Sequence, residues 1–197
     1  MLHEIDNFNS VFQQEIDDSH AFFVTPVGAY SSQKLLEEAE SHLSKWSQQV
    51  INDKQKRDWQ AAGTCLALDL YTASGFHAMR AVEEEARIYH KVVTGVALDD
   101  VPLGALINGS NKKGGLKPQY ILEGEKSDSP LGLIVSMLAQ LNKIYRCPIM
   151  HPEMTLDAES ARIVFNLASI AISAIVEDGA RRLQAQAQKE QAQGQTP

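Results

Sequence analysis

The segment 157-DAESARIVFNLASIAISAIVEDGARRL-183 decides the fold class. Its apolar residues recur every three or four positions, which is the spacing of one face of an α-helix. Asp157, which directly precedes this run, carries a side chain suited to a helix N-cap. The segment therefore predicts a core helix over residues 158–183, whose buried stripe is Ala161, Val164, Phe165, Ala168, Ala171, Ile172 and Ile175.

The same period predicts further helices along the chain. They cover residues 33–51, 54–93, 99–108 and 131–145, with Gly95 ending the second. Ser129-Pro130 is a helix start, because Ser suits the N-cap and Pro suits the first helical position. Residues 109–118 are rich in Gly and Lys and predict a loop, while Pro148 and Pro152 predict breaks in the chain. One short β-like run, residues 21–25, stops at Pro26.

These helices predict one all-α, antiparallel, up-and-down bundle over residues 31–183. Residues 1–30 form an N-terminal extension that holds five acidic residues and no Lys or Arg. Residues 184–197 are rich in Gln and Ala and lack an apolar stripe, so we expect a flexible tail.

Composition excludes several classes of protein. The chain has 197 residues, 44% hydrophobic, with a net charge of −7, which argues against non-specific coating of nucleic acid. No apolar run reaches the roughly 18 residues of a membrane span, and no signal peptide is evident. Two cysteines, Cys65 and Cys147, are too few for a disulfide framework, so we expect a cytoplasmic protein. Nucleotide-binding loops and metal-ligand spacings are absent, so neither cofactor nor metal is expected.

The candidate chemistry lies in 145-YRCPIMHPE-153, where Arg146 and His151 are five positions apart. We expect the prolines to form a rigid corner that displays both side chains together. A His ring can take a proton from a ribose 2′-hydroxyl and return one to the leaving oxygen. An Arg can bind the phosphate and stabilise the charge that develops on it. This pair is therefore a candidate site for phosphodiester cleavage. The structural alternative is an Arg that only binds the last carbonyls of its helix.

Residues 145–175, YRCPIMHPEMTLDAESARIVFNLASIAISAI, resemble the C-terminal part of HEPN domains. Residues 64–90, TCLALDLYTASGFHAMRAVEEEARIYH, resemble the long helix that precedes the motif in bacterial HEPN-like proteins. The resemblance covers about residues 55–182. It implies a helical bundle whose motif Arg and His correspond to Arg146 and His151.

The resemblance also implies a function. Many HEPN proteins are metal-independent endoribonucleases of toxin–antitoxin, antiviral defence and CRISPR-associated systems, and they typically act as homodimers. The expected partners are therefore RNA, a second copy of the chain, and an antitoxin or defence-system protein. Active members usually place Asn, Asp or His after the motif Arg, whereas this chain has Cys147. The alternative is a non-catalytic HEPN-like helical module for dimerisation and interaction, in which Arg146 would be held in an internal ion pair.

Supporting residues come from two other segments. Glu83 lies on an apolar stripe, so we expect a partner for its carboxylate, which is either Arg146 or Arg87 four residues on. Arg80 is a candidate accessory phosphate contact, or it pairs with Glu84. Three lysines of the Gly-rich loop are weaker candidates for binding RNA, or they are simply solvated: Lys112, Lys113 and Lys117.

The acidic extension suggests one further hypothesis. Residues 1–30 carry a charge of −5 and could fold over the Arg146–His151 site as a built-in mimic of RNA.

Overall fold

The computed structural model describes residues 5, 24–99, 101–109, 114–122, 124, 129–151 and 154–193. All regular secondary structure in these ranges is helical, which confirms the predicted all-α class. The single β pairing within them is an isolated bridge between Val27 and Tyr30, so the expected strand at 21–25 is not formed by its described residues.

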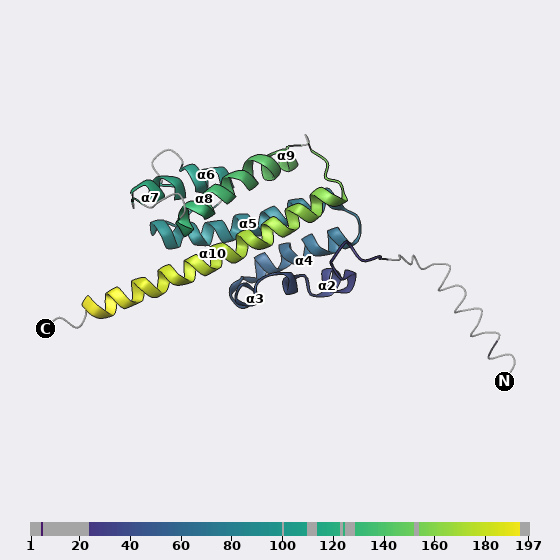
Figure 1. Cartoon of the computed structure of the whole chain (residues 1–197), viewed down its shortest axis with the longest axis horizontal. Coiled ribbons are helices and arrows are strands. Elements are labelled where there is room, and N and C mark those ends of the chain that lie inside the picture. Colours follow the sequence, from purple (N-terminus) through teal and green to yellow (C-terminus); the bar gives the residue numbers. More distant parts are fainter. Residues whose placement is uncertain are drawn as a thin grey trace.

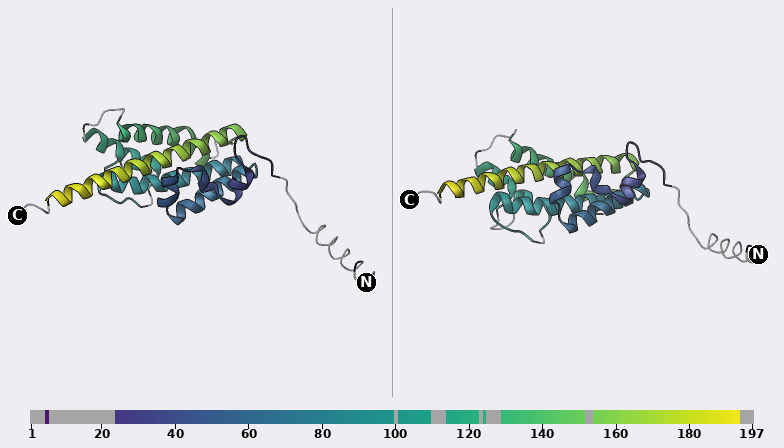
Figure 2. Two further views of the ribbon diagram at one scale, coloured as in Figure 1. Left: turned by 60° about the horizontal axis from the view of Figure 1, so that its bottom comes forward. Right: turned by 90° about the horizontal axis from the view of Figure 1, so that it is seen from below.

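Four long helices form the body of the bundle, and consecutive ones run in alternating directions (Figures 1 and 2). Since they alternate, α5 and α10 run in the same direction. At one end the Leu156 N–H donates to the Thr72 hydroxyl (2.9 Å), and at the other the Tyr89 hydroxyl donates to Asp178 (2.5 Å). The long helices are α4 (Asp53–Ala67), α5 (Tyr71–Thr94), α8 (Pro130–Leu141) and α10 (Ala158–Gln193).

Shorter elements complete the bundle. One group packs along α4 and α10, and the other lies beside α5 and α8 (Figure 1). The first group is α2 (Ser32–Glu37), the 3₁₀ turn η1 (Ala39–His42) and α3 (Lys45–Val50). The second is α6 (Leu103–Asn108), α7 (Leu116–Leu122), the π-helical turn η2 (Asn142–Arg146) and α9 (Cys147–Met150).

The predicted helix over residues 54–93 is wrong, because the chain reverses direction between α4 and α5. Asp69 adopts a left-handed backbone conformation (φ 60°), and the Leu70 N–H donates to the Cys65 carbonyl (2.8 Å). The Ser74 hydroxyl then binds the Ala62 carbonyl across the hairpin (2.8 Å). Neither Gly nor Pro marks this reversal, so the helical period continues through it in the sequence. Gly95, also left-handed, ends α5 as predicted.

The predicted helix over residues 33–51 is divided into α2, η1 and α3. The Gln60 side chain of α4 holds the first break, donating to the carbonyls of Leu35 (2.9 Å) and Leu36 (2.7 Å) and accepting from the Ala39 N–H (3.0 Å). A tertiary contact thus satisfies backbone groups that an unbroken helix would pair internally. The predicted loop 109–118 is likewise shorter than expected, since α7 begins at Leu116.

Pro148 does not break the chain as predicted. The helix passes from α8 through η2 into α9, and the Cys147 N–H donates to the Asn142 carbonyl five residues earlier. A proline ring collides with the carbonyl four residues before it in a regular α-helix. The wider π turn contains one extra residue per turn, which relieves that collision and lets the helix continue to Met150.

The stripe predicted for α10 is confirmed: all seven of its residues are buried in the core. Asp157 caps the helix, accepting from the Ser160 N–H (2.8 Å), and Ser129 caps α8 in the same way through Gly132 (3.1 Å). Residues 184–193, expected to be a flexible tail, continue α10 as an exposed helix that projects from the bundle (Figure 1).

By length and composition α10 is apolar enough to cross a membrane, contrary to the expectation that no apolar run of the chain is long enough. Half of its most apolar window is buried inside the bundle, as is usual for the core helix of a folded domain. The buried half includes Phe165, which stacks on Trp59 of α4 with ring centroids 4.4 Å apart.

Two buried polar links tie the helices together. The Gln55 amide donates to the carboxylate of Glu85 (2.5 Å), which joins α4 to α5. Tyr89 joins α5 to α10 through Asp178, a side chain that also accepts from Arg181 and Arg182. Buried polar groups require such partners, because an unpaired one costs free energy of folding.

Candidate functional site

A small pocket of about 200 Å³ brings together three of the seven predicted site residues, Arg80, Glu83 and Arg146. Its walls come from α4, α5 and the η2–α9 segment, and phenyl and thioether side chains form its apolar part. The charged lining residues are Lys54, Asp58, Arg80, Glu83, Arg87 and Arg146, and the apolar ones are Phe76, Met79 and Met150.

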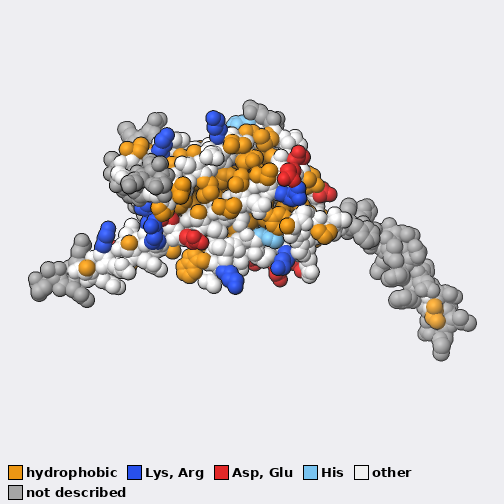
Figure 3. Space-filling model, in the orientation of Figure 1, with side chains coloured by type: hydrophobic (Ala, Val, Ile, Leu, Met, Phe, Trp, Pro, Cys, Tyr) orange, Lys and Arg blue, Asp and Glu red, His pale blue; other side chains and the backbone are white. Residues whose placement is uncertain are grey.

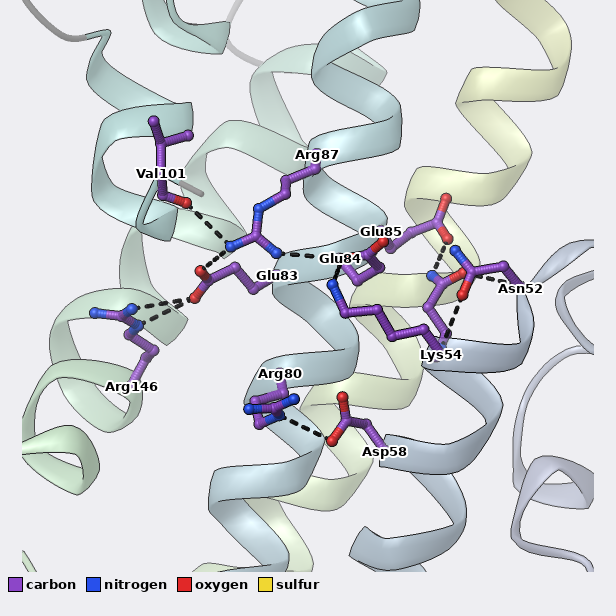
Figure 4. A network of polar contacts seen from close by, with 11 residues as sticks. Asn52, Lys54, Asp58, Arg80, Glu83, Glu84, Glu85, Arg87, Val101 and Arg146 are labelled. Atoms are coloured by element: carbon purple, nitrogen blue, oxygen red, sulfur yellow. Dashed lines mark hydrogen bonds and ion pairs between the residues drawn. The ribbon is translucent and has the colours of Figure 1, made fainter. Parts of the chain in front are cut away.

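Glu83 binds both of the arginines that the sequence offered as its partner (Figure 4). Its Oε2 accepts from the Nε of Arg146 (3.2 Å), and its Oε1 lies 2.5 Å from the Nη2 of Arg87. Arg87 also donates to the Val101 carbonyl (3.1 Å). The Arg146 side chain is 17% exposed and that of Glu83 is 12% exposed. Glu83 therefore fixes the positions of Arg146 and Arg87 together, so both of the predicted alternatives for its partner form.

Glu84 extends this network to α4. Lys54 lies 2.6 Å from its carboxylate, and Arg87 lies 3.2 Å away. Burial alone would raise the pKa of Glu84, but Lys54 and Arg87 outweigh burial and lower that pKa below its ordinary value. Glu84 is therefore committed to these two cations, and the predicted alternative pair between Arg80 and Glu84 does not form.

Arg80 pairs instead with Asp58 of α4 (Nε to Oδ1, 2.9 Å) and lies over the ring of Phe76, 5.7 Å from its centroid. Its side chain is half exposed. The Nδ1 of His77 is 3.1 Å from the same Asp58 oxygen. His77 is thus a partly exposed residue with a polar partner.

The structure does not bring His151 into the pocket that Arg146 lines. Helical structure continues from Arg146 to Met150, so the predicted rigid corner is wrong. Five residues of α-helix rotate the chain about 140° beyond a full turn, which directs positions 146 and 151 to different sides. His151 is exposed and ends α9, where its N–H donates to the Cys147 carbonyl (3.0 Å). The Cys147 thiol lies 3.7 Å from the Asn142 side-chain oxygen.

The predicted basic loop adds nothing to this pocket among the described residues. Lys117 is exposed on α7 and does not line the pocket. Lys112 and Lys113 lie outside the described residues, as do residues 1–4 and 6–23 of the acidic segment 1–30 that was expected to cover the site.

Lys54 and Asp58 of α4 line the pocket, although neither was among the predicted site residues. In an unbroken helix Lys54 and Glu84 would be about 45 Å apart, so no spacing rule could join them. The unpredicted reversal at Asp69 places α5 alongside α4. It thereby allows the ion pairs between Lys54 and Glu84 and between Asp58 and Arg80. Among the described residues, no group of three His, Cys, Asp or Glu side chains is arranged to hold a metal ion.

Comparison with known proteins gives no match to a protein-family model, to a curated protein or to a solved structure. The likeness to HEPN domains is therefore carried by the quoted sequence segments alone.

Proposed function

We propose that the protein is a non-catalytic, HEPN-like helical module that acts by binding another protein chain. The observation that carries this proposal is the position of Arg146. Its guanidinium is engaged by Glu83 inside the bundle, and His151 lies outside the pocket that it lines. A general acid–base and a phosphate-binding group must reach the same phosphodiester, and a single copy of this chain does not provide that arrangement.

The sequence around the motif supports the same proposal. Cys147 replaces the polar residue that usually follows the motif Arg, and a thiol is a weak hydrogen-bond donor and acceptor. Its sulfur is directed to Asn142 within its own helix. In this proposal the cluster of Glu83, Arg87 and Arg146 joins α5 to η2 and serves to hold the bundle together.

The second candidate is a metal-independent endoribonuclease of bacterial defence or toxin–antitoxin systems. The exposed ring of His151 favours it, since that ring is free to act on a substrate or on the site of another copy. In this candidate His151 is the general acid–base, Arg146 binds the phosphate, Glu83 positions Arg146 and Arg80 is an accessory contact. The products would carry a 2′,3′-cyclic phosphate and a 5′-hydroxyl.

One experiment separates the two candidates. The purified full-length protein is incubated in excess with a pool of single-stranded RNA in EDTA, alongside His151→Ala and the control Lys189→Ala on the exposed end of α10. The module proposal expects no cleavage beyond buffer by any of the three proteins. Cleavage by wild type and Lys189→Ala that is lost in His151→Ala would overturn it in favour of the nuclease. Equal cleavage by all three would identify a contaminating activity and remove the nuclease candidate.

A further inference from the structure

The solvent-facing side of α10 carries an apolar stripe that the bundle does not use. Ile163 is 41% exposed and Ile170 is 57% exposed, with the partly buried Leu167 and Ala174 on the same side. Their spacing of four, three and four residues places them in one row along the helix. The opposite side of α10 already supplies the core, so this second row is available for another contact.

The neighbouring helix widens the stripe into a face. Leu133 of α8 is 59% exposed and Ile144 of η2 is 47% exposed. A groove of about 480 Å³ lies between α8 and α10, and its lining includes Leu133, Met137 and Ala174. Figure 3 shows hydrophobic side chains gathered in a band across this side of the molecule. We call this band the α8–α10 face; contiguous exposed apolar area of this kind marks interaction surfaces in soluble proteins.

Charged residues stand at both ends of the α10 stripe in the same order. Glu159 and Arg162 precede it, and Glu177 and Arg181 follow it. At 100° per residue, Glu159, Glu177 and Arg181 all fall within roughly 20° of Ile170 around the helix. The side chains of Glu159 and Arg181 are 68% and 60% exposed. Each has a neighbour in its own helix, Arg162 and Asp178 respectively, but both remain accessible at the surface.

We propose that the α8–α10 face binds a second copy of this chain, with the two α10 helices antiparallel and Ile170 on the two-fold axis. In that register Glu159 of each copy faces Arg181 of the other. Arg162, beside Ile163, comes within reach of the other copy's Glu177. A two-fold contact must be self-complementary. This pattern meets that condition, because each acidic side chain of one copy faces a basic side chain of the other. A parallel pairing would place like charges together at both ends, so the charges select the antiparallel one.

This pairing gives the protein interaction proposed above a partner and a geometry. It also differs from a dimer with one shared Arg–His cleft. Ala158 and Ile170 are twelve residues apart, so the first residues of the two α10 helices lie about 36 Å from each other. Figure 1 shows α9 at the same end of the bundle as the start of α10. The two Arg146 pockets therefore lie at opposite ends of the pair.

Sedimentation analysis of the full-length protein over a range of concentrations tests the face. We expect wild type to form dimers that Ile170→Glu converts to monomers. Leu70→Glu is the matched control, because Leu70 is 54% exposed in the turn between α4 and α5 and does not line the groove between α8 and α10. A wild-type monomer at ~100 μM, beyond the range of stable dimers, would overturn the proposal, as would dimers that Ile170→Glu leaves intact.

Charge reversal tests the register. Glu159→Arg and Arg181→Glu should each weaken self-association by on the order of tenfold or more, since two symmetric contacts become like-charged. An equimolar mixture of the two variants should form heterodimers, because both contacts are then opposite in charge. The heterodimer also shows that each variant is folded. Failure of the mixture to associate, while wild type dimerises, would overturn the antiparallel register. None of these readouts depends on RNA cleavage, so this proposal and the proposed function can fail separately.

Discussion

The Nε of Arg146 lies 3.2 Å from Oε2 of Glu83, although the two residues are 63 positions apart in the chain. The other oxygen of the same carboxylate binds Arg87. One carboxylate thus bridges two largely buried guanidinium groups, and Arg87 has a second carboxylate partner in Glu84.

We expect Glu83→Gln to lower the free energy of unfolding by about 2–3 kcal/mol, because it leaves the partly buried Arg146 without its counter-charge and leaves Arg87 with Glu84 alone. Urea denaturation followed by circular dichroism measures the change. Glu190→Gln, on the exposed end of α10, should leave the midpoint unchanged. Equal midpoints for Glu83→Gln and wild type would show that the cluster contributes no stability.

Two glycines in helices should respond to alanine in opposite ways. A Cβ at Gly63 would lie 2.7 Å from both the Leu35 carbonyl oxygen and the Ala39 Cβ, where α4 meets α2 and η1. Gly63→Ala should therefore destabilise the protein by about 1–3 kcal/mol through overpacking. At Gly179 the nearest atom would be a Tyr89 ring carbon at 3.7 Å, an ordinary contact. Gly179→Ala should stabilise by up to ~1 kcal/mol, since Ala favours the helix. Thermal melts of both variants check the signs, and a loss of stability in Gly179→Ala would contradict this packing.

Glu85 should make the free energy of unfolding depend on pH above the ordinary range of glutamate. Burial raises the pKa of its carboxyl, and the hydrogen bond from Gln55 only partly opposes burial. A carboxyl whose pKa is raised by folding favours the folded state most at low pH, and that contribution is lost as pH rises through the folded pKa. Glu85→Gln should therefore be more stable than wild type at pH 8, and this gain should shrink toward pH 4. Denaturation midpoints of both proteins across that pH range test this prediction. A gain in stability of Glu85→Gln that does not vary with pH would contradict a raised pKa for Glu85.

Asp178 should have the opposite dependence. Burial alone would raise its pKa, but hydrogen bonds from Tyr89, Arg182 and Arg181 together lower the pKa below its ordinary value. The resulting stabilisation is present above the ordinary Asp pKa of about 3.9 and is lost as pH falls through the folded pKa. Asp178→Asn should be clearly less stable than wild type at pH 7, and this difference should narrow below pH ~4. Urea unfolding curves of both proteins at pH 7 and below pH ~4 measure this difference in stability. A difference that is larger at the acidic pH would contradict a lowered pKa for Asp178.

The sequence predicted those features that local rules determine. The α10 stripe, the Ser129-Pro130 start and the Asp157 cap each depend on residues within a turn or two of one another. A partner for Glu83 was also predicted, because an acid on an apolar stripe requires one, and both alternatives, Arg146 and Arg87, are contacted.

The features that could not be predicted depend on distant contacts. The reversal at Asp69 lacks Gly and Pro, and it is stabilised by Ser74 binding across the hairpin. The break after α2 depends on Gln60, which lies in another helix. The pairing of Lys54 with Glu84 follows only once the reversal is known, so the α4 side of the pocket was not predictable from spacing.

The π turn η2 changes the direction in which the side chains of α9 point around the helix axis. One additional residue within a turn rotates all later side chains by about 100° about the axis. Ile149 is buried after η2, 3.1 Å from where a Cβ on Gly75 would lie, whereas Pro148 is only half-buried. Deleting a single residue between positions 142 and 146 would restore a regular α-helical repeat, turn Ile149 outward and separate Arg146 from Glu83. The additional residue thus sets the rotation of the helix about its axis. The ion pair between Glu83 of α5 and Arg146 of η2 depends on that rotation.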